Sequence, residues 1–186
     1  MTGLLHMQQP LFYAIIINCN EREGGVCMAE TVYCADAEAT EALGRKLGRL
    51  CRDGDVFLLD GDLGTGKTCL ATAAAVALGV DPQEVTSPTF SLMNVYHGSR
   101  LNIKHFDLYR INWPEELEDI GFSEYAGGDG VTFIEWAELF PEYMPEENLE
   151  LKLTRQGEGR QIELCPHGRR YEELARALVA PKGWEG

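Results

Sequence analysis

Residues 61–68 (GDLGTGKT) contain the residue types and the spacing that binding of a phosphate tail requires. They fit the pattern GxxxxGK[ST], whose glycines let the backbone curl so that N–H groups and a helix N-terminus converge on phosphate oxygens. Lys67 is then placed to neutralise the β and γ phosphates, and the Thr68 hydroxyl to ligate Mg²⁺. A turn that only joins a strand to a helix has no use for these two residues. We therefore expect a nucleotide site here.

Hydrolysis needs two further groups, an acid near the metal and a sensor of the γ phosphate. Asp107 and Glu135 each follow a strand-like segment, and ligands of open α/β sheets bind at the carboxyl ends of strands. Either carboxylate could hold the metal or its water. With 30 acidic residues in the chain, a surface charge at a strand end is the alternative for Glu135. The loop 86–89 (TSPT) is either an ordinary turn or a hydroxyl-rich sensor of a terminal phosphate.

An alternation of strand-like and helix-like segments must position these groups. Residues 56–59 form a continuous apolar run, as in a parallel strand buried on both faces, and residues 67–78 form an Ala- and Leu-rich helix. The other expected elements are strands at 31–34, 91–96, 101–106 and 131–134, a hairpin of 149–153 with 161–165, and helices at 38–51, 115–118 and 171–179. The pattern predicts an α/β fold like that of P-loop NTPases, with a mostly parallel central sheet, helices on both faces and added antiparallel strands.

The length of 186 residues predicts a single domain, which we place at residues 28–186, after an atypical N-terminal extension of residues 1–27. The first 20 residues contain no Asp, Glu, Lys or Arg, but they lack the basic start and cleavage site of a signal peptide. The apolar run at 11–17 is far shorter than the roughly 20 residues that span a bilayer. Two interpretations stay open: an added edge strand, or a translation start at Met28.

Charge and cysteine content restrict the partners and the compartment. The formal net charge of −14 repels a phosphate backbone, so direct binding to nucleic acid is disfavoured. The six cysteines include no CxxC pair and favour a reduced thiol set, as in a cytoplasmic protein. The four histidines form no ligand cluster, so the sequence gives little support to a structural zinc site.

Four motifs together carry a family resemblance: residues 61–68, then 87–90 (SPTF), then 105–110 (HFDLYR), then 134–136 (IEW). In this order and spacing they resemble the TsaE (YjeE) family of small bacterial P-loop ATPases, over about residues 28–164. The combination of HxDLYR with a later EW is far more specific than the P-loop alone. Residues 38–44 also look like the family's opening helix, and residues 159–160 like its C-terminal hairpin turn.

The resemblance implies an ATPase that assists synthesis of threonylcarbamoyladenosine, the modified adenosine beside the anticodon of certain tRNAs. In that family the protein binds a complex of TsaB and TsaD, and its ATP cycle is thought to reset that complex between turnovers. The partner would then supply the tRNA surface, in agreement with the acidity of this chain. The phosphates would be held by Leu63, Gly64, Thr65, Gly66, Lys67 and Thr68. Thr68 and Glu135 would be the Mg²⁺ ligands, and Asp107 a further acid at the metal or the attacking water.

The remaining candidates rest on shorter motifs or on position. Trp136 would pack near the site, Ser87 and Thr89 belong to the possible phosphate sensor, and Ala37 and Arg160 are weaker candidates for nucleotide contacts. We expect His105 to be a packed or hydrogen-bonding strand residue, while residues 109–110 could be structural, a partner contact or a charge sensor. Two departures from the family pattern are the extension at 1–27 and Thr65, which stands where Ala is common.

Other functions make different demands on the sequence. A GTPase needs an NKxD element, and residues 102–105 (NIKH) do not provide one. A small-molecule kinase would use Asp107 or Glu135 as the base and would need arginines over the phosphates, for which only Arg110, Arg155 and Arg160 are plausible. A docking module that binds ATP but hydrolyses almost none is the third alternative.

Overall fold

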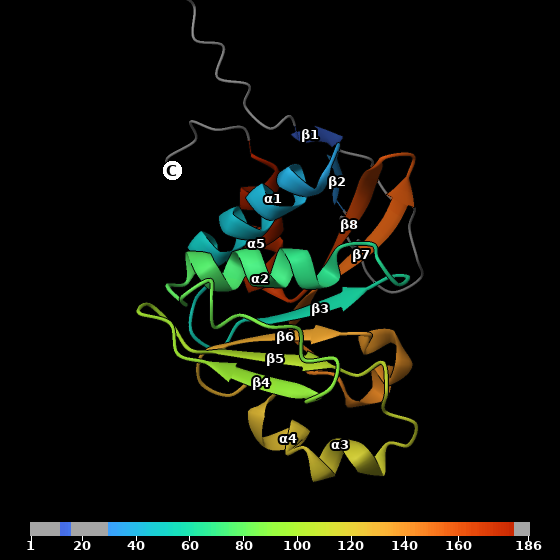
Figure 1. Cartoon of the computed structure of the whole chain (residues 1–186). Helices are drawn as coiled ribbons and strands as arrows, with labels where there is room; N and C mark the ends of the chain where they lie inside the picture. The colour runs from blue at the N-terminus through green and yellow to red at the C-terminus, as the bar shows by residue number, and fades with distance from the viewer. Residues whose placement is uncertain (1–11, 16–29, 181–186) are drawn as a thin grey trace, which may run out of the picture.

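The computed structural model describes residues 12–15 and 30–180, which build one mixed sheet with helices on both faces (Figure 1). The strands are β1 (Phe12–Ile15), β2 (Glu30–Cys34), β3 (Val56–Asp60), β4 (Met93–Tyr96), β5 (Ile103–Asp107), β6 (Val131–Glu135), β7 (Asn148–Gln156) and β8 (Gly159–His167). The α-helices are α1 (Ala37–Leu50), α2 (Lys67–Ala77), α3 (Glu115–Asp119), α4 (Phe122–Tyr125) and α5 (Arg169–Val179). Two 3-10 helices follow β6, namely η1 (Ala137–Leu139) and η2 (Pro141–Tyr143).

The eight strands lie in the order β1-β2-β8-β7-β3-β6-β5-β4. The central strands β7, β3, β6 and β5 pair in parallel, whereas β4 on one side and β8, β2 and β1 on the other add antiparallel pairings. Every residue of β3, β5 and β6 is buried, as expected for parallel strands covered on both faces. The carboxyl ends of these three strands therefore meet at one edge of the parallel core.

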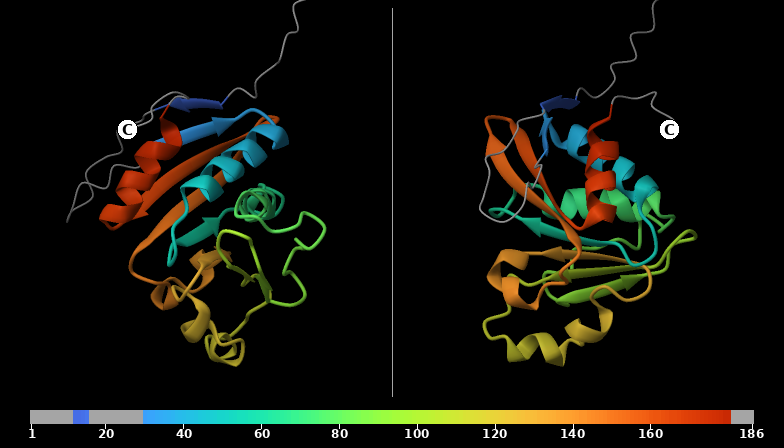
Figure 2. Two further views of the ribbon diagram at one scale, coloured as in Figure 1. Left: turned by 90° about the vertical axis from the view of Figure 1, so that its left-hand side faces the viewer. Right: turned by 180° about the vertical axis from the view of Figure 1, so that it is seen from behind.

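Helices α1, α2 and α5 cover one face of the sheet, and α3 and α4 lie on the other side (Figures 1 and 2). On the first face, Leu43 of α1, Leu70 of α2 and Leu174 of α5 share one apolar cluster. On the second face, the rings of Phe106 and Phe122 meet edge to face at 5.1 Å within a smaller cluster.

Two glycines allow α1 to approach α2 closely. A Cβ at Gly44 would lie 2.4 Å from the backbone oxygen of Leu70, and one at Gly48 would lie 2.4 Å from that of Ala74. No side chain fits these gaps without displacing a helix. The close approach holds α1 against α2, the helix whose first residues are Lys67 and Thr68.

The fold class predicted from the sequence is confirmed, and the differences concern the ends of elements and three short helices. The expected strand at 91–96 begins only at Met93, because Leu92 has a positive φ of 64° and its N–H donates to Pro88 O at 2.7 Å in a turn. The hairpin strands are nine residues each rather than five. The expectation missed α4, η1 and η2, which are too short for a periodic signal.

At the N-terminus, β1 pairs antiparallel with β2, which agrees with the interpretation of an added edge strand. The alternative start at Met28 lies outside the described residues. None of the described helices combines the length and the apolar character of a membrane-spanning segment.

Candidate nucleotide site

The loop of residues 61–68 connects the carboxyl end of β3 to the start of α2, and its glycines adopt backbone angles that other residues avoid. Gly61 and Gly66 have φ values of 129° and 107°. A Cβ at Gly61 would lie 2.2 Å from the backbone oxygen of Leu153, so this position excludes every side chain. Thr65 is buried and donates from Oγ1 to Asp62 O at 2.9 Å, which stabilises the curl. Leu63, in contrast, is 77% exposed at the tip of the loop.

The Lys67 ammonium is held inside this curl by three contacts. Nζ donates to Gly61 O and, at 3.1 Å, to Asp62 O, and it lies 3.6 Å from the centroid of the Trp136 ring. Burial lowers the pKa of Lys67 below its ordinary value, and the negative charge of Glu135 is the largest influence that raises it. The arrangement presents a desolvated cation at the centre of the loop.

Trp136 reaches Lys67 because the chain turns sharply after β6. Its backbone is left-handed, with a φ of 63°, and its N–H donates to Leu59 O at 3.0 Å. The Tyr109 ring packs against the indole at a centroid distance of 4.8 Å. A strained, well-supported aromatic residue beside a lysine is typical of a functional site rather than of a surface turn.

Glu135 is the polar centre of the site. It is 3% exposed at the end of β6, and its Oε2 accepts from Thr68 Oγ1 at 3.0 Å. Its other oxygen, Oε1, lies 2.9 Å from Nε2 of His105, which donates because an ionised carboxylate only accepts. Thr68 and Glu135 are 67 residues apart in sequence, and the parallel pairing of β3 with β6 brings them together.

Asp107 lies directly beside Glu135, because the two are register partners in β5 and β6. Its Oδ2 accepts from Thr89 Oγ1 at 3.0 Å, and its Oδ1 accepts from Tyr109 N at 3.1 Å. The hydroxyls of Ser87 and Thr89 are 2.7 Å apart, so the TSPT loop is joined to Asp107 by a short chain of hydroxyls.

Arg160 and Ala37 approach the loop from its other side. Arg160 Nε donates to Thr65 O at 2.8 Å, across 95 residues of sequence. Ala37 is the exposed first residue of α1, whose N-cap Asp36 accepts from Ala39 N at 2.8 Å. Because β2 pairs with β8 so that Cys34 faces Arg160, the start of α1 and the arginine lie at the same edge of the site.

A second pair of carboxyl groups, which no sequence motif predicts, lies next to the loop. Glu138 N donates to Asp60 Oδ1 at 3.1 Å, and Gly61 N lies 3.4 Å from Glu138 Oε1. Burial, together with hydrogen bonding to and repulsion by Glu138, raises the pKa of Asp60 to about 8.

The structure thus gathers most of the predicted site residues in one place. Lys67, Thr68, Trp136 and Glu135 form one contact group, and Arg160 reaches it through Thr65. Asp107, Thr89 and Ser87 adjoin this group, while Ala37 lies at its edge. His105 is the packed, hydrogen-bonding strand residue that the sequence predicts, but its partner Glu135 was not predicted. The spacing of His105 and Asp107 could have indicated that His105 belongs to the site, because residues two apart on a strand face the same side.

Comparison with known proteins agrees with this arrangement. The family model "Threonylcarbamoyl adenosine biosynthesis protein TsaE" matches residues 34–162. The chain belongs to the TsaE family. The tRNA threonylcarbamoyladenosine biosynthesis protein TsaE of Bacillus subtilis (strain 168) is 39% identical over 142 residues, which cover 76% of this chain and 88% of that protein. Its counterpart in Treponema pallidum (strain Nichols) is 42% identical over 123 residues, or 66% and 90% of the two chains.

A solved structure shares the fold. The crystal structure of Bacillus subtilis YdiB superposes with a TM-score of 0.70 at 31% identity, covering 83% of this chain and 97% of that one. The range matched by the TsaE model contains every site residue described above, from Ala37 to Arg160, and ends before α5. The recognised resemblance is therefore confirmed at the level of the family.

Proposed function

We propose that this TsaE-family chain is a Mg²⁺-dependent ATPase that acts in threonylcarbamoyladenosine modification of tRNA, by resetting a complex of TsaB and TsaD homologues between turnovers. The observation that carries the proposal is the hydrogen bond between Thr68 and Glu135. It joins the hydroxyl that ends a phosphate-binding motif to a carboxylate from a distant strand, which is the pairing that a nucleotide-bound magnesium ion needs.

The loop supplies the phosphate site in this proposal. Gly66 precedes α2 in a left-handed conformation with no side chain capping the helix, so the first N–H groups of α2 are available to phosphate oxygens. Lys67 is already desolvated among backbone carbonyls and the Trp136 ring, and burial lowers its pKa. A phosphate charge offers this cation a stronger partner than carbonyl dipoles do, which favours binding of the nucleotide.

The residues at the site fit a magnesium ion. Mg²⁺ prefers hard oxygen ligands, keeps several waters and takes few ligands from protein. Thr68 Oγ1 and Glu135 Oε2 are such oxygens, and among the described residues no cluster of three or more His, Cys, Asp or Glu offers a denser cage. When bound, the ion would neutralise charge on the β and γ phosphates.

The groups around Asp107 are suited to binding the attacking water and the terminal phosphate. Thr89 donates to one oxygen of Asp107 and a backbone N–H to the other, so the carboxylate is held in a fixed orientation as an acceptor for a water proton. Thr89 and Ser87 add hydroxyls that can donate to a terminal phosphate. Contact with tRNA falls to the partner complex in this proposal, because a net charge of −14 opposes direct binding.

The test is ATP hydrolysis measured with and without the TsaB–TsaD pair, together with formation of threonylcarbamoyladenosine on tRNA. We expect slow turnover alone and stimulation by the pair. Lys67→Ala should abolish nucleotide binding, whereas Glu135→Ala should bind nucleotide and lose Mg²⁺-dependent turnover. Glu124→Gln, on the exposed surface of α4, is the control for loss of one negative charge.

Two outcomes would contradict the proposal. A phosphorylated small-molecule product would favour the kinase. Full tRNA modification by a variant that binds ATP without hydrolysing it would favour the docking module.

A further inference from the structure

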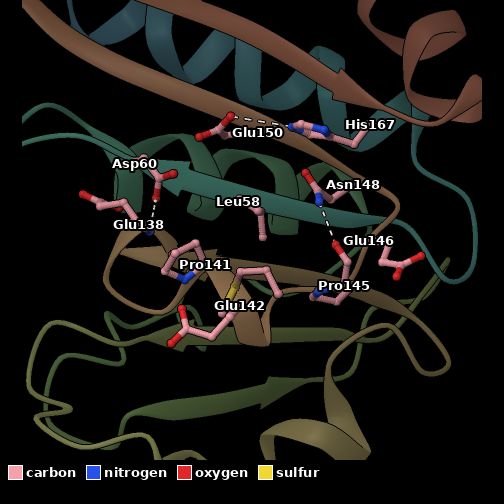
Figure 3. A pocket seen from close by; sticks show the side chains of 12 residues that line it. Leu58, Asp60, Glu138, Pro141, Glu142, Pro145, Glu146, Asn148, Glu150 and His167 are labelled. Atoms are coloured by element: carbon pink, nitrogen blue, oxygen red, sulfur yellow. Dashed lines mark hydrogen bonds and ion pairs between the residues drawn. The ribbon is translucent and has the colours of Figure 1, made fainter. Parts of the chain in front are cut away.

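A cavity of about 420 Å³ lies beside the nucleotide site, between β3, β7 and the two 3-10 helices that follow β6 (Figure 3). Among its lining residues, His167 is the only basic one. Five are acidic, namely Asp60, Glu138, Glu142, Glu146 and Glu150. The other lining residues are Leu58, Ala137, Pro141, Met144, Pro145 and Asn148. Because the pKa of Asp60 is about 8 and Glu150 is paired with Lys152 at 3.1 Å and with His167 at 3.7 Å, the negative charge of the cavity comes mainly from Glu138, Glu142 and Glu146.

Asn148 gives an independent indication that this cavity suits a hydrogen-bond donor. The residue is 5% exposed at the start of β7, and its Nδ2 donates to Pro145 O at 2.7 Å. Its Oδ1 is buried and accepts no hydrogen bond from the described residues. A buried acceptor without a donor is costly, so a ligand that supplies N–H groups would be stabilised there.

These features together select a cationic, multi-donor group. Small-molecule pockets are lined mainly by hydrophobic and aromatic side chains, and no aromatic residue lines this cavity apart from His167. In the described residues no cluster of metal ligands is present either. A guanidinium has five N–H donors and no acceptor, and it is more weakly hydrated than an ammonium, so it suits carboxylates and an amide oxygen in a half-buried site.

We propose that this cavity receives an arginine side chain presented by a partner protein. A protein rather than a free cation is favoured by the surface beside the cavity, where Leu139 of η1 and Tyr143 of η2 are both 46% exposed. These large apolar side chains neighbour Glu138 and Glu142 in sequence, on the same two 3-10 helices. An arginine in a pocket surrounded by apolar contacts is a frequent anchor of protein interfaces.

The cavity also connects directly to the phosphate loop. Glu138 lines the cavity and contacts Gly61 N, and the carbonyl of Gly61 accepts from the Lys67 ammonium. A guanidinium that pairs with Glu138 competes with Gly61 N for this carboxylate. The docked arginine therefore changes the environment of the first residue of the loop.

The test does not depend on ATP binding, so it can fail separately from the proposed function. We would titrate the full-length, ¹⁵N-labelled chain with N-acetyl-L-arginine amide and follow its amide spectrum. The control is N-acetyl-L-citrulline amide, which has the same length but an uncharged urea group. We expect saturable shifts of the Asn148 side-chain amide and of the Glu138 and Gly61 backbone amides with arginine, and at least fivefold weaker binding of citrulline.

Variants locate the binding to the cavity. Replacing two exposed lining residues, Glu142→Gln with Glu146→Gln, should weaken arginine binding several-fold. The matched control, Glu115→Gln with Glu118→Gln on α3, removes the same charge outside the cavity and should leave the affinity unchanged. Equal binding of citrulline, shifts confined to other residues, or equal effects of the two double variants would overturn the site. An unmoved Gly61 amide would overturn its connection to the loop.

Two further probes test the nature of the ligand. N-acetyl-L-lysine amide should bind more weakly than the arginine compound, and tighter binding would overturn the choice of a guanidinium. The peptide acetyl-Leu-Arg-Leu-amide should bind more tightly than the single amino acid, because its leucines can contact Leu139 and Tyr143. Equal affinity of the peptide and the amino acid would overturn a protein as the source of the arginine.

Discussion

Replacement of His105 tests whether this buried imidazole positions the carboxylate of Glu135. In the His105→Leu variant a side chain of similar volume fills the same place on β5, but the 2.9 Å bond to Glu135 Oε1 is lost. A hydrogen bond to a charged group contributes about 1.5–3 kcal/mol. For a domain of this size 1 kcal/mol corresponds to roughly 2–4 °C, so we expect the melting temperature to fall by about 3–12 °C.

The functional effect is larger if Glu135 ligates Mg²⁺ as proposed. Loss of a residue that orients a metal ligand typically reduces metal affinity about 10–100-fold. We expect the Mg²⁺ concentration for half-maximal ATP hydrolysis to rise by that factor, while ATP affinity measured in EDTA changes by less than about twofold. The ATP affinity in EDTA separates a positioning role of His105 from general damage to the fold.

His105→Gln is the matched variant, because its amide can still donate to Glu135. It should restore most of the Mg²⁺ dependence. If folded His105→Leu protein showed an unchanged Mg²⁺ requirement, or if His105→Gln were as impaired as His105→Leu, the reasoning would be refuted.

Three other substitutions test the scaffold by urea or thermal unfolding. Gly44→Ala should destabilise the protein by roughly 1–2 kcal/mol, because overpacking against α2 outweighs the gain of about 1 kcal/mol in helix propensity. A rise in stability would contradict the close contact between α1 and α2. Asp55→Asn removes the negative charge and one of the two oxygens that accept from Arg170 at 3.0 and 2.6 Å, and it should cost about 2–3 kcal/mol, since the arginine side chain keeps 20% exposure. The exposed-pair control Glu172→Gln should cost less than about 0.5 kcal/mol. Asp60 has a pKa of about 8 in the folded protein, whereas its ordinary value is 3.8, so it binds a proton more tightly in the folded state. Stability should therefore fall as the pH rises from about 4 to 8, and Asp60→Asn should lessen this fall.

The sequence alone was sufficient to predict the features that depend on residues adjacent in the chain. The phosphate motif, the helix after it and the buried strand before it are contiguous, and their residue types and periodicity indicate them directly. The order of strands and helices was sufficient for the fold class. Asp107 and Glu135 were found because each carboxylate directly follows a strand-like segment.

Only the tertiary structure decided which of these residues touch. Thr68 meets Glu135 across 67 residues, Arg160 meets Thr65 across 95, and Glu138 meets Asp60 across 78. These contacts depend on the position of β3 between β6 and β7 and on the register of each pair, which no local pattern encodes. The acidic cavity is a product of the same strand order, because its walls come from segments that only the folded sheet brings side by side.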